Sequence, residues 1–582
     1  MAVSSLYPES TSVTGSVGSG VVTDEEGVPV SDAGGTSDTD AHATIHNIQD
    51  IDLPTATCKG SRPAGAPRRQ HPPRDGAAIL RPMRVWAWSS WLLPLLAGCP
   101  YISAEHLADR VDLDDDGYAA TGAGGEDCDD TSATTYPGAT ELPGDGVDAD
   151  CDGRVEFGLY GEIRDGGIGG VIAVGDMDND GVADLAVAAP DTAEGGHVYL
   201  IPGPIDDGSD ERLAEAAKLT LISGEPGTRL GQAMVLGQDV DENGYTDSFI
   251  GAPGFGAGSV LVFPGSEEDL QGTHVLTGGF FQLVGDETGD LTGESMTVRS
   301  GDVRLLLIGA PGASDTAGRV YGFSTSNLTQ EKAPPVSEAA RVAIEGPEGG
   351  AFGWSQDAAD LSCDGLPDFL VGAPDADEEA GAVAILISPV PDGSLGADDI
   401  DPWVGGETAG DGLGIAIAGT GDVDGDGCDD ALIGAWQDSP RDAGYALVIT
   451  GEEGGTMAVL VGEVEGDQAG MSVSAAGDLD GDGLDDLVVG APDADGAAGD
   501  ETGVVYLWLG QQGLTGTIAL GDAAIRTEGT EAFYGLGAAV WGSAGEDGDL
   551  DGDGYPDVIM GAPGADYDAS GAGALFLIYG AP

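Results

Sequence analysis

The chain has 582 residues, of which 103 are Asp or Glu and only 20 are Lys or Arg, so its formal net charge is −83. We expect no nucleic-acid partner, because binding to phosphates requires a basic surface. Hydrophobic residues still make up 41% of the chain, which is enough to form a core. The acidic residues recur at fixed spacings instead of forming terminal blocks, so we expect them to have local roles.

Residues 1–82 are polar, rich in Ser, Thr, Gly and Pro, and show no hydrophobic periodicity. We expect them to be disordered, or to lie upstream of a true translation start at Met83. Cys58 lies in this segment, and we assign it no role.

Residues 83–99 have the composition of an export signal. A basic start at Arg84 is followed by an apolar run from Val85 to Leu96, which is too short to span a membrane as a helix. The run ends in Leu-Leu-Ala-Gly-Cys at Cys99, which resembles a bacterial lipobox and implies lipidation of Cys99. A buried apolar helix with an incidental cysteine is the alternative. A true start at Met1 would rule out the lipid anchor.

Residues 100–154 form an acidic module. Asp112, Asp114 and Asp116 alternate, and oxygen donors at this spacing suit calcium. The Asp-Cys-Asp-Asp and Asp-Cys-Asp-Gly sequences resemble a short metal-binding module of secreted bacterial proteins. Cys128 and Cys151 would form a disulfide in an exported protein. The alternative is a flexible acidic linker stapled by its cysteines.

Residues 155–582 contain seven repeats, each marked by Gly-Ala-Pro or a close variant. Each unit reads as four short strands, with a Phe-Gly-like pair such as Phe352-Gly353 before the first, and no stretch shows helical periodicity. Four strands in about 60 residues, repeated radially, predict an all-β, seven-bladed β-propeller with four-stranded blades. The last unit lacks a fourth strand, so we expect the segment around Phe157 to complete it and close the ring.

This pattern resembles the FG-GAP repeats of integrin α chains. The resemblance implies that loops on one face hold calcium and that loops on the opposite face present a binding surface. Trp354, Trp403, Trp436, Trp508 and Trp541 are candidates for that surface, although a propeller core would also use tryptophan.

Six units carry an acidic loop with ligands at positions one, three, five and nine, and a glycine at position six. Alternating oxygens wrap an ion in a tight turn, so we predict about six structural calcium ions in the propeller. Asx-type turns without metal are the alternative. The predicted ligands are Asp176, Asp178, Asp180 and Asp184; Asp239, Asp241, Asn243 and Asp247; Asp360, Ser362, Asp364 and Asp368; Asp422, Asp424, Asp426 and Asp430; Asp478, Asp480, Asp482 and Asp486; and Asp549, Asp551, Asp553 and Asp557.

Blade three lacks this pattern, because Leu305 replaces the closing acid and Arg304 precedes it, so we predict no calcium there. The neutral Ser362 should weaken the site of blade four. Cys363 and Cys428 lie in the loops of blades four and five. They could form a disulfide or remain thiols, and we favour thiols slightly.

No catalytic constellation stands out. The propeller has two histidines, His197 and His274, at unrelated positions in their units, so we expect no enzyme. We predict a lipid-anchored cell-surface or periplasmic protein, or a secreted one, that binds an unknown protein or glycan and touches the membrane only through its lipid. A structural coat protein is the alternative, and a hydrolase carrying these repeats comes third. The ligand and the oligomeric state are not predictable from the sequence.

Overall fold

The computed structural model divides the chain into two units, Met1–Leu96 and Ala97–Pro582. The residues that it describes all lie in the second unit. They run from 157 to 580, without 162, 164–165, 178–180, 206–210, 239–245, 264–271, 277–280, 300–304, 325–334, 437–442, 452–454, 497–498, 500, 530–533, 544–547, 551–553 and 566–570. Within this part, no helix is long and apolar enough to cross a membrane.

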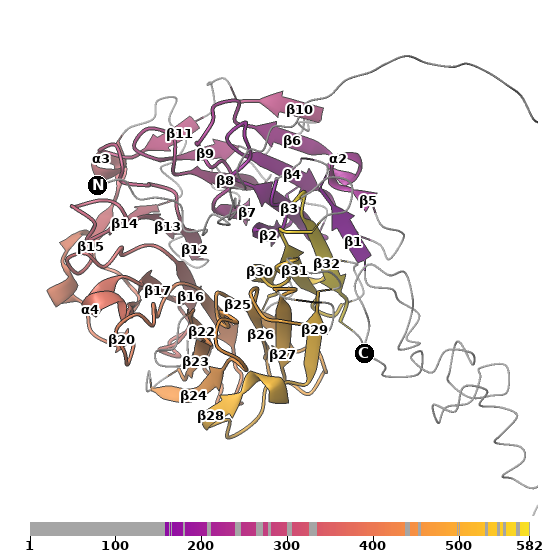
Figure 1. The fold of residues 1–582 in the computed structure, drawn as a ribbon. Helices are drawn as coiled ribbons and strands as arrows, with labels where there is room; N and C mark the ends of the chain where they lie inside the picture. The colour runs from indigo at the N-terminus through magenta and orange to yellow at the C-terminus, as the bar shows by residue number, and fades with distance from the viewer. Residues whose placement is uncertain are drawn as a thin grey trace, which may run out of the picture. The chain divides into compact units, whose positions relative to one another are not determined.

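Seven β-sheets form a ring around a central axis (Figure 1). The innermost strand of each sheet contacts the innermost strand of the next, and the seventh contacts the first, so the circle is closed. The predicted seven-bladed β-propeller is therefore confirmed. The Gly-Ala-Pro repeats predict the ring because each one ends the second strand of a blade.

Blades one to three follow one another along the chain, and the four strands of each blade run in order from the inside of the ring to the outside. Blade one contains β2 (Val171–Gly175), β3 (Asp184–Ala189), β4 (His197–Ile201) and β6 (Leu219–Ile222). Blade two contains β7 (Met234–Gln238), β8 (Asp247–Ala252), β9 (Ser259–Phe263) and β11 (Phe281–Val284). Blade three contains β12 (Met296–Arg299), β13 (Leu305–Ala310), β14 (Arg319–Ser324) and β15 (Val342–Glu345).

Blades four to six repeat the arrangement. Blade four contains β16 (Gln356–Ala359), β17 (Asp368–Ala373), β18 (Ala382–Leu386) and β20 (Trp403–Gly405). Blade five contains β21 (Ile417–Gly421), β22 (Asp430–Ala435), β23 (Tyr445–Ile449) and β24 (Thr456–Val461). Blade six contains β25 (Ser472–Gly477), β26 (Asp486–Ala491), β27 (Val504–Trp508) and β29 (Ile525–Glu528).

Blade seven joins the two ends of the propeller sequence. It contains β30 (Ala539–Trp541), β31 (Val558–Ala562), β32 (Ala574–Ile578) and β1 (Phe157–Tyr160). β1 pairs antiparallel with β32, with Phe157 opposite Leu577 and Tyr160 opposite Ala574. The predicted ring closure is thereby confirmed, and the closed ring leaves no unpaired inner strand.

Four blades carry a fifth strand that the sequence analysis did not predict. Each of these strands lies between the third and fourth strands of one blade and pairs in parallel with the outermost strand of the preceding blade. They are β5 (Glu211–Arg212), β10 (Gly272–Val275), β19 (Gly393–Leu395) and β28 (Gly516–Ala519). We call them crossing strands. They are mostly exposed, so they lack the buried apolar alternation that marks the other strands.

The described helices are single turns in the loops, in agreement with the absence of helical periodicity. They are α2 (Leu213–Ala216), α3 (Val336–Ala339), α4 (Ala376–Glu379) and the 3-10 turns η3 (Ala397–Asp399) and η4 (Leu520–Asp522).

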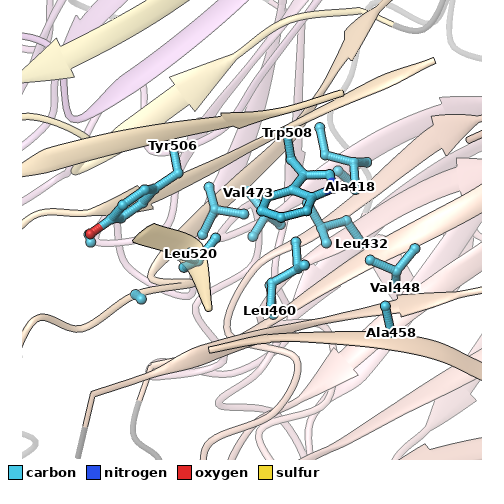
Figure 2. Close-up of a cluster of buried hydrophobic side chains, with 14 of the residues drawn as sticks. Ala418, Leu432, Val448, Ala458, Leu460, Val473, Tyr506, Trp508 and Leu520 are labelled. Carbon is cyan, nitrogen blue, oxygen red and sulfur yellow. The ribbon is translucent and has the colours of Figure 1, made fainter. Parts of the chain in front are cut away.

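The hydrophobic core consists of layers between neighbouring blades. Between blades five and six, Trp508 packs with Leu432, Leu460 and Val473 (Figure 2). Trp508 is 7% exposed, so it belongs to the core and not to a binding surface. Trp403 packs against the Phe352 ring at a centroid distance of 5.9 Å, which also assigns it to the core.

Glycines hold the blades in close contact. The glycine of each Phe-Gly-like pair has a positive φ, as at Gly470 with φ +86°. The Gly470 N–H donates to the carbonyl of Gly490 in its own blade (3.0 Å), and the Gly470 carbonyl faces Gly434 of the preceding blade. A Cβ on Gly434 would lie 2.0 Å from that carbonyl oxygen. The glycine of the Phe-Gly-like pair and, in every blade but the first, the glycine before Ala-Pro therefore lie at backbone contacts between blades; blade one has Ala188 at the second position.

Candidate metal centres

The acidic loops connect the first and second strands of the blades, so they all lie on one face of the propeller. In blade five, both carboxylate oxygens of Asp422 accept backbone hydrogen bonds, from the N–H groups of Asp426 (3.0 Å) and Gly427 (2.9 Å). In blade six, Asp478 accepts the same pair of bonds from Asp482 and Gly483 (both 2.9 Å). The first acid of the loop therefore folds the turn around its own carboxylate.

The alternating acids converge in these two loops. One carboxylate oxygen from each of Asp422, Asp424 and Asp426 lies within 4.8 Å of the others, and the same holds for Asp478, Asp480 and Asp482. Oxygens on opposite sides of a calcium ion are about 4.6–5.2 Å apart, because each Ca–O distance is about 2.3–2.6 Å. The two clusters therefore fit the oxygen shell of calcium.

Blade four has the same turn with one neutral donor. Asp360 accepts hydrogen bonds from the N–H groups of Asp364 (3.0 Å) and Gly365 (2.7 Å). The hydroxyl oxygen of Ser362 is buried and has no hydrogen-bond partner, which is costly unless another group satisfies it. A cation in this loop would satisfy that oxygen, so the donor set of blade four also fits calcium.

The ninth residue of each loop is a buried aspartate that anchors the loop. In blade five, one Asp430 oxygen accepts the N–H of Val423 and the other accepts the N–H of Gly451, both at 3.0 Å. In blade six, Asp486 accepts the N–H groups of Leu479 (2.9 Å) and Gly510 (2.8 Å). These bonds tie the acidic loop to the end of the third strand. That the ninth acid also closes a calcium shell stays a prediction.

Burial dominates the electrostatics of these anchors. It raises the pKa of Asp430 to about 7, although the two backbone N–H donors oppose the shift and the neighbouring Asp424 and Asp426 add to it. Burial likewise raises the pKa of Asp486 to about 6. Without a counter-charge, the ionised loops are therefore electrostatically unfavourable.

The remaining predicted ligands are only partly described. In blades one and seven, Asp176 and Asp549 accept the N–H of the glycine at position six, Gly181 (3.0 Å) and Gly554 (2.8 Å). Asp184, Asp247, Asp368 and Asp557 are all buried. The predicted residues outside the described part are Asp178, Asp180, Asp239, Asp241, Asn243, Asp551 and Asp553, the blade-three segment 300–304, and the N-terminal residues Cys99, Asp112, Asp114, Asp116, Cys128 and Cys151.

The eighth loop residue, to which we assigned no role, links neighbouring loops. The side chain of Asp429 in blade five accepts the N–H of Asp360 in blade four (2.8 Å). The hydroxyl of Thr246 in blade two donates to the carbonyl of Asp176 in blade one (2.6 Å). Each link joins the end of one loop to the beginning of the preceding one. The position could have been identified from its place next to the ninth acid, but its residue type varies.

A disulfide joins the loops of blades four and five. Cys363 and Cys428 are bonded, with their Cα atoms 5.1 Å apart. Our slight preference for thiols was therefore wrong, because the loops of adjacent blades approach closely enough for the bond. Cys363 has φ +56°, at a position where blades five and six have glycines with positive φ.

The opposite face is formed by the loops between the second and third strands and those that lead to the next blade. Arg229, Asp191 and the buried Glu294 meet there, with Arg229 donating to Glu294 (3.0 Å). Trp354 and Trp436 follow the glycines of the repeat on this face and are half-buried. Both remain candidates for a binding surface.

His197 has a structural environment. Its Nδ1 lies 3.0 Å from the hydroxyl of Thr192, and both side chains are buried. Burial lowers the pKa of His197, which keeps the ring neutral. These contacts hold the loop before β4.

Together, the fold and the loops define a seven-bladed β-propeller with acidic turns on one face. Comparison with known proteins assigns the repeats. A model described as FG-GAP repeat matches residues 169–201, 352–386, 469–508 and 547–578, and a Cu-binding MopE metal-binding motif matches residues 127–156.

Curated relatives include integrin chains. Mouse integrin alpha-7 is 35% identical over 116 residues, and mouse integrin alpha-E is 40% identical over 127 residues, each match covering 19% of this chain. Rat phosphatidylinositol-glycan-specific phospholipase D is 27% identical over 263 residues, or 40% of this chain. The matches span 9%, 10% and 29% of these proteins' own lengths. The chain thus contains FG-GAP repeats homologous to those of integrin α and a metal-binding motif, as the sequence analysis predicted.

Proposed function

We propose that this chain is a calcium-stabilised binding protein on the outside of the cell, held to a membrane by a lipid on Cys99. It binds a protein or a glycan through the face opposite the acidic loops. The observation that carries the proposal is the convergence of three carboxylates in each of two loops, within 4.8 Å of one another. Three further loops share the hydrogen bond from the glycine at position six to the first acid.

Calcium would stabilise the folded state and would take no part in a reaction. The ion would neutralise carboxylates that repel one another and would join the alternating acids of a single turn. Because neighbouring loops are linked by hydrogen bonds, an ion in one loop would also stabilise the start of the preceding loop. This role explains why acids persist at buried positions such as Asp430 and Asp486.

The binding role is supported by the homology to integrin α and by the difference between the two faces of the propeller, since the acidic loops all lie on one of them. The metal loops use one face for stability, which leaves the loops of the other face free to vary. On that face, Phe255 and Val464 are 38% and 60% exposed. Exposed apolar side chains and the half-buried Trp354 and Trp436 on the same face suit contacts with a protein surface or a sugar ring.

Two other functions compete with this proposal. A coat protein without a specific ligand would use the same calcium loops for rigidity. A hydrolytic role has one observation in its favour, the similarity to a phospholipase D, but that match covers only 29% of the relative. The catalytic activity of the relative therefore does not transfer to this chain.

The proposal is tested with the purified chain in two steps. Thermal unfolding in 2 mM calcium and in excess chelator should differ by well over 10 °C, because several ions that bind only the folded state add their effects. Elemental analysis should then find several calcium ions for each chain, and an array of glycans and surface-protein extracts should yield a saturable ligand. Equal unfolding midpoints with no bound calcium would refute the metal role. Calcium binding without any ligand would favour the coat protein.

A further inference from the structure

The crossing strands follow a fixed spacing. We define the junction residue of a blade as the one whose N–H donates to the carbonyl of the glycine before the third strand, as Gly285 donates to Gly258 (2.9 Å). Three crossing strands begin thirteen residues before this junction residue: β10 at Gly272 before Gly285, β19 at Gly393 before Gly406, and β28 at Gly516 before Gly529.

The partner positions are equally regular. The first residue of each of these strands pairs with the residue four positions before the junction residue of the preceding blade: Gly272 with Leu219, Gly393 with Val342, and Gly516 with Ala458. β5 also pairs with the outermost strand of the preceding blade, but in a shifted register. Glu211 pairs with Leu159, which lies two positions before Gly161, the junction residue of blade seven. The pairing of a crossing strand with the preceding blade therefore recurs with the repeat and is not peculiar to one loop.

The outer strand of blade six, β29, pairs with no crossing strand among the described residues, and its edge shows the consequence. The position four residues before its junction residue is Ile525, which is 43% exposed. The equivalent Leu219, Val342 and Ala458 are 8%, 2% and 0% exposed. A β-branched apolar residue at the open edge of β29 is a site for pairing with another strand.

The outer strand of blade four, β20, also has no crossing strand beside it among the described residues, and its edge is protected in another way. The loop of blade five turns back at once, with Thr450 N–H bonded to the carbonyl of Gly455 (3.0 Å). The position that corresponds to Ile525 is Pro402, which has no N–H and so protects the edge from pairing. Blade six has no such proline in β29, so its edge is suited to an occupant.

The order of the strands along the chain indicates which segment would pair with this edge. Blade seven follows blade six, and its fourth strand is β1, so the segment that should cross to β29 is the one that precedes β1. Gly161 is the junction residue of blade seven, because its N–H donates to the carbonyl of Gly573 (3.0 Å). Thirteen residues before Gly161 stands Asp148, which lies outside the described part of the chain.

We propose that the edge of β29 is the docking site of the segment that begins at Asp148, in a parallel register with Asp148 opposite Ile525. This segment belongs to the metal-binding motif of residues 127–156. The motif would then be fixed to the rim of blade six instead of being joined to the propeller by a free linker. The first residue of the three regular crossing strands is a glycine with positive φ, and aspartate is among the few other residue types that adopt such angles.

Cross-linking in the full chain tests this register. Directly opposed residues of neighbouring strands have Cα atoms about 5 Å apart, which allows a disulfide. Asp148→Cys with Ile525→Cys should form an intramolecular disulfide at least tenfold faster than Asp148→Cys with Val275→Cys. Val275 is the matched control because it is an exposed apolar residue, 52% exposed, on the crossing strand β10 beside blade one. Mass spectrometry of linked peptides identifies the bonds.

Equal rates for the two pairs would overturn the proposal, and so would a disulfide between two chains, which would assign the edge to a second copy. Hydrogen exchange on the unmodified chain gives a second measurement that does not depend on the folding of a variant. The amides of residues 149–151 should include at least one that exchanges a hundredfold slower than in an unstructured peptide. Uniformly fast exchange there would also refute the docking.

Discussion

The side chain of Asp485 in blade six accepts the backbone N–H of Asp422 in blade five, with the oxygen 2.8 Å from the nitrogen. In return, the N–H of Asp485 donates to the carbonyl of Asp422 (3.1 Å). Asp422 is the first residue of one candidate metal loop, and Asp485 is the residue before the buried anchor of the next. Stability gained in one loop is therefore transmitted to its neighbour, so the acidic face should behave as a connected unit.

The disulfide between blades four and five should add to this connection. Replacing Cys363 with Gly and Cys428 with Leu gives these positions the residue types of blade six, Gly481 and Leu484. We expect the double variant to lose about 2–4 kcal/mol of unfolding free energy, because the bond closes a loop of about 65 residues in the unfolded chain. Denaturant unfolding of the two proteins measures the loss.

The matched control for the disulfide prediction is the parent protein in a reductant that leaves the sequence unchanged. The reductant should destabilise the parent and leave the propeller transition of the variant unaltered. A variant as stable as the oxidised parent would show that the link adds nothing to the folded state.

The metal site proposed in blade four can be tested by replacing its neutral donor, Ser362, with a charged one. Ser362→Asp should raise the unfolding midpoint in calcium and lower it in chelator, because the added carboxylate strengthens an ion site but repels Asp360 and Asp364 when no ion is bound. Thermal unfolding in both buffers measures the two shifts. Ser394→Asp, on the exposed strand β19, is the control and should shift both midpoints by the same small amount. Parallel shifts for Ser362→Asp would contradict a metal site in blade four.

The sequence predicted the ring, its closure and the loop positions because these features repeat. Seven glycine-based motifs in register leave little freedom for the order of strands, and Gly161 and Tyr160 match the corresponding residues of other blades. The crossing strands were missed because residues such as Gly393 and Ser394 are exposed, so no buried face imposes a pattern on them. The Cys363–Cys428 bond was left open beside the slightly favoured thiols for another reason: the approach of two loops depends on tertiary structure, which residue spacing does not encode.

A half-buried acid far from the metal loops provides a pH test. Asp493, on the opposite face, accepts a hydrogen bond from the side chain of Gln468 (2.5 Å). Burial raises its pKa to about 6, and the nearby Glu501 and Asp467 add to the shift. Because the folded-state pKa lies above the unfolded value, the stability contributed by Asp493 is complete below about pH 4 and is lost as the pH rises through 6.

Asp493→Asn should therefore be more stable than the parent at pH 8 and should show no such gain at pH 4. The amide oxygen can still accept the hydrogen bond from Gln468, so the comparison isolates the charge. Denaturant unfolding at both pH values, in chelator, measures the difference. Asp398→Asn, an exposed change, is the control and should show little pH-dependent gain. A gain of the same size at pH 4 and pH 8 would mean that ionisation of Asp493 is not its cause.

The glycine contact between blades makes the sharpest prediction about the repeat itself. Gly434→Ala places a methyl group 2.0 Å from the carbonyl oxygen of Gly470, so the paired strands of the two blades must shift to accept it. We expect a loss of about 1–3 kcal/mol or more in unfolding free energy, as for an overpacked core. Gly455→Ala is the matched control in the same blade, because a Cβ there meets no atom within 4 Å and its φ is not positive. If the two variants were equally stable, the repeated glycines would have to be explained by backbone entropy or folding kinetics instead of contact between blades.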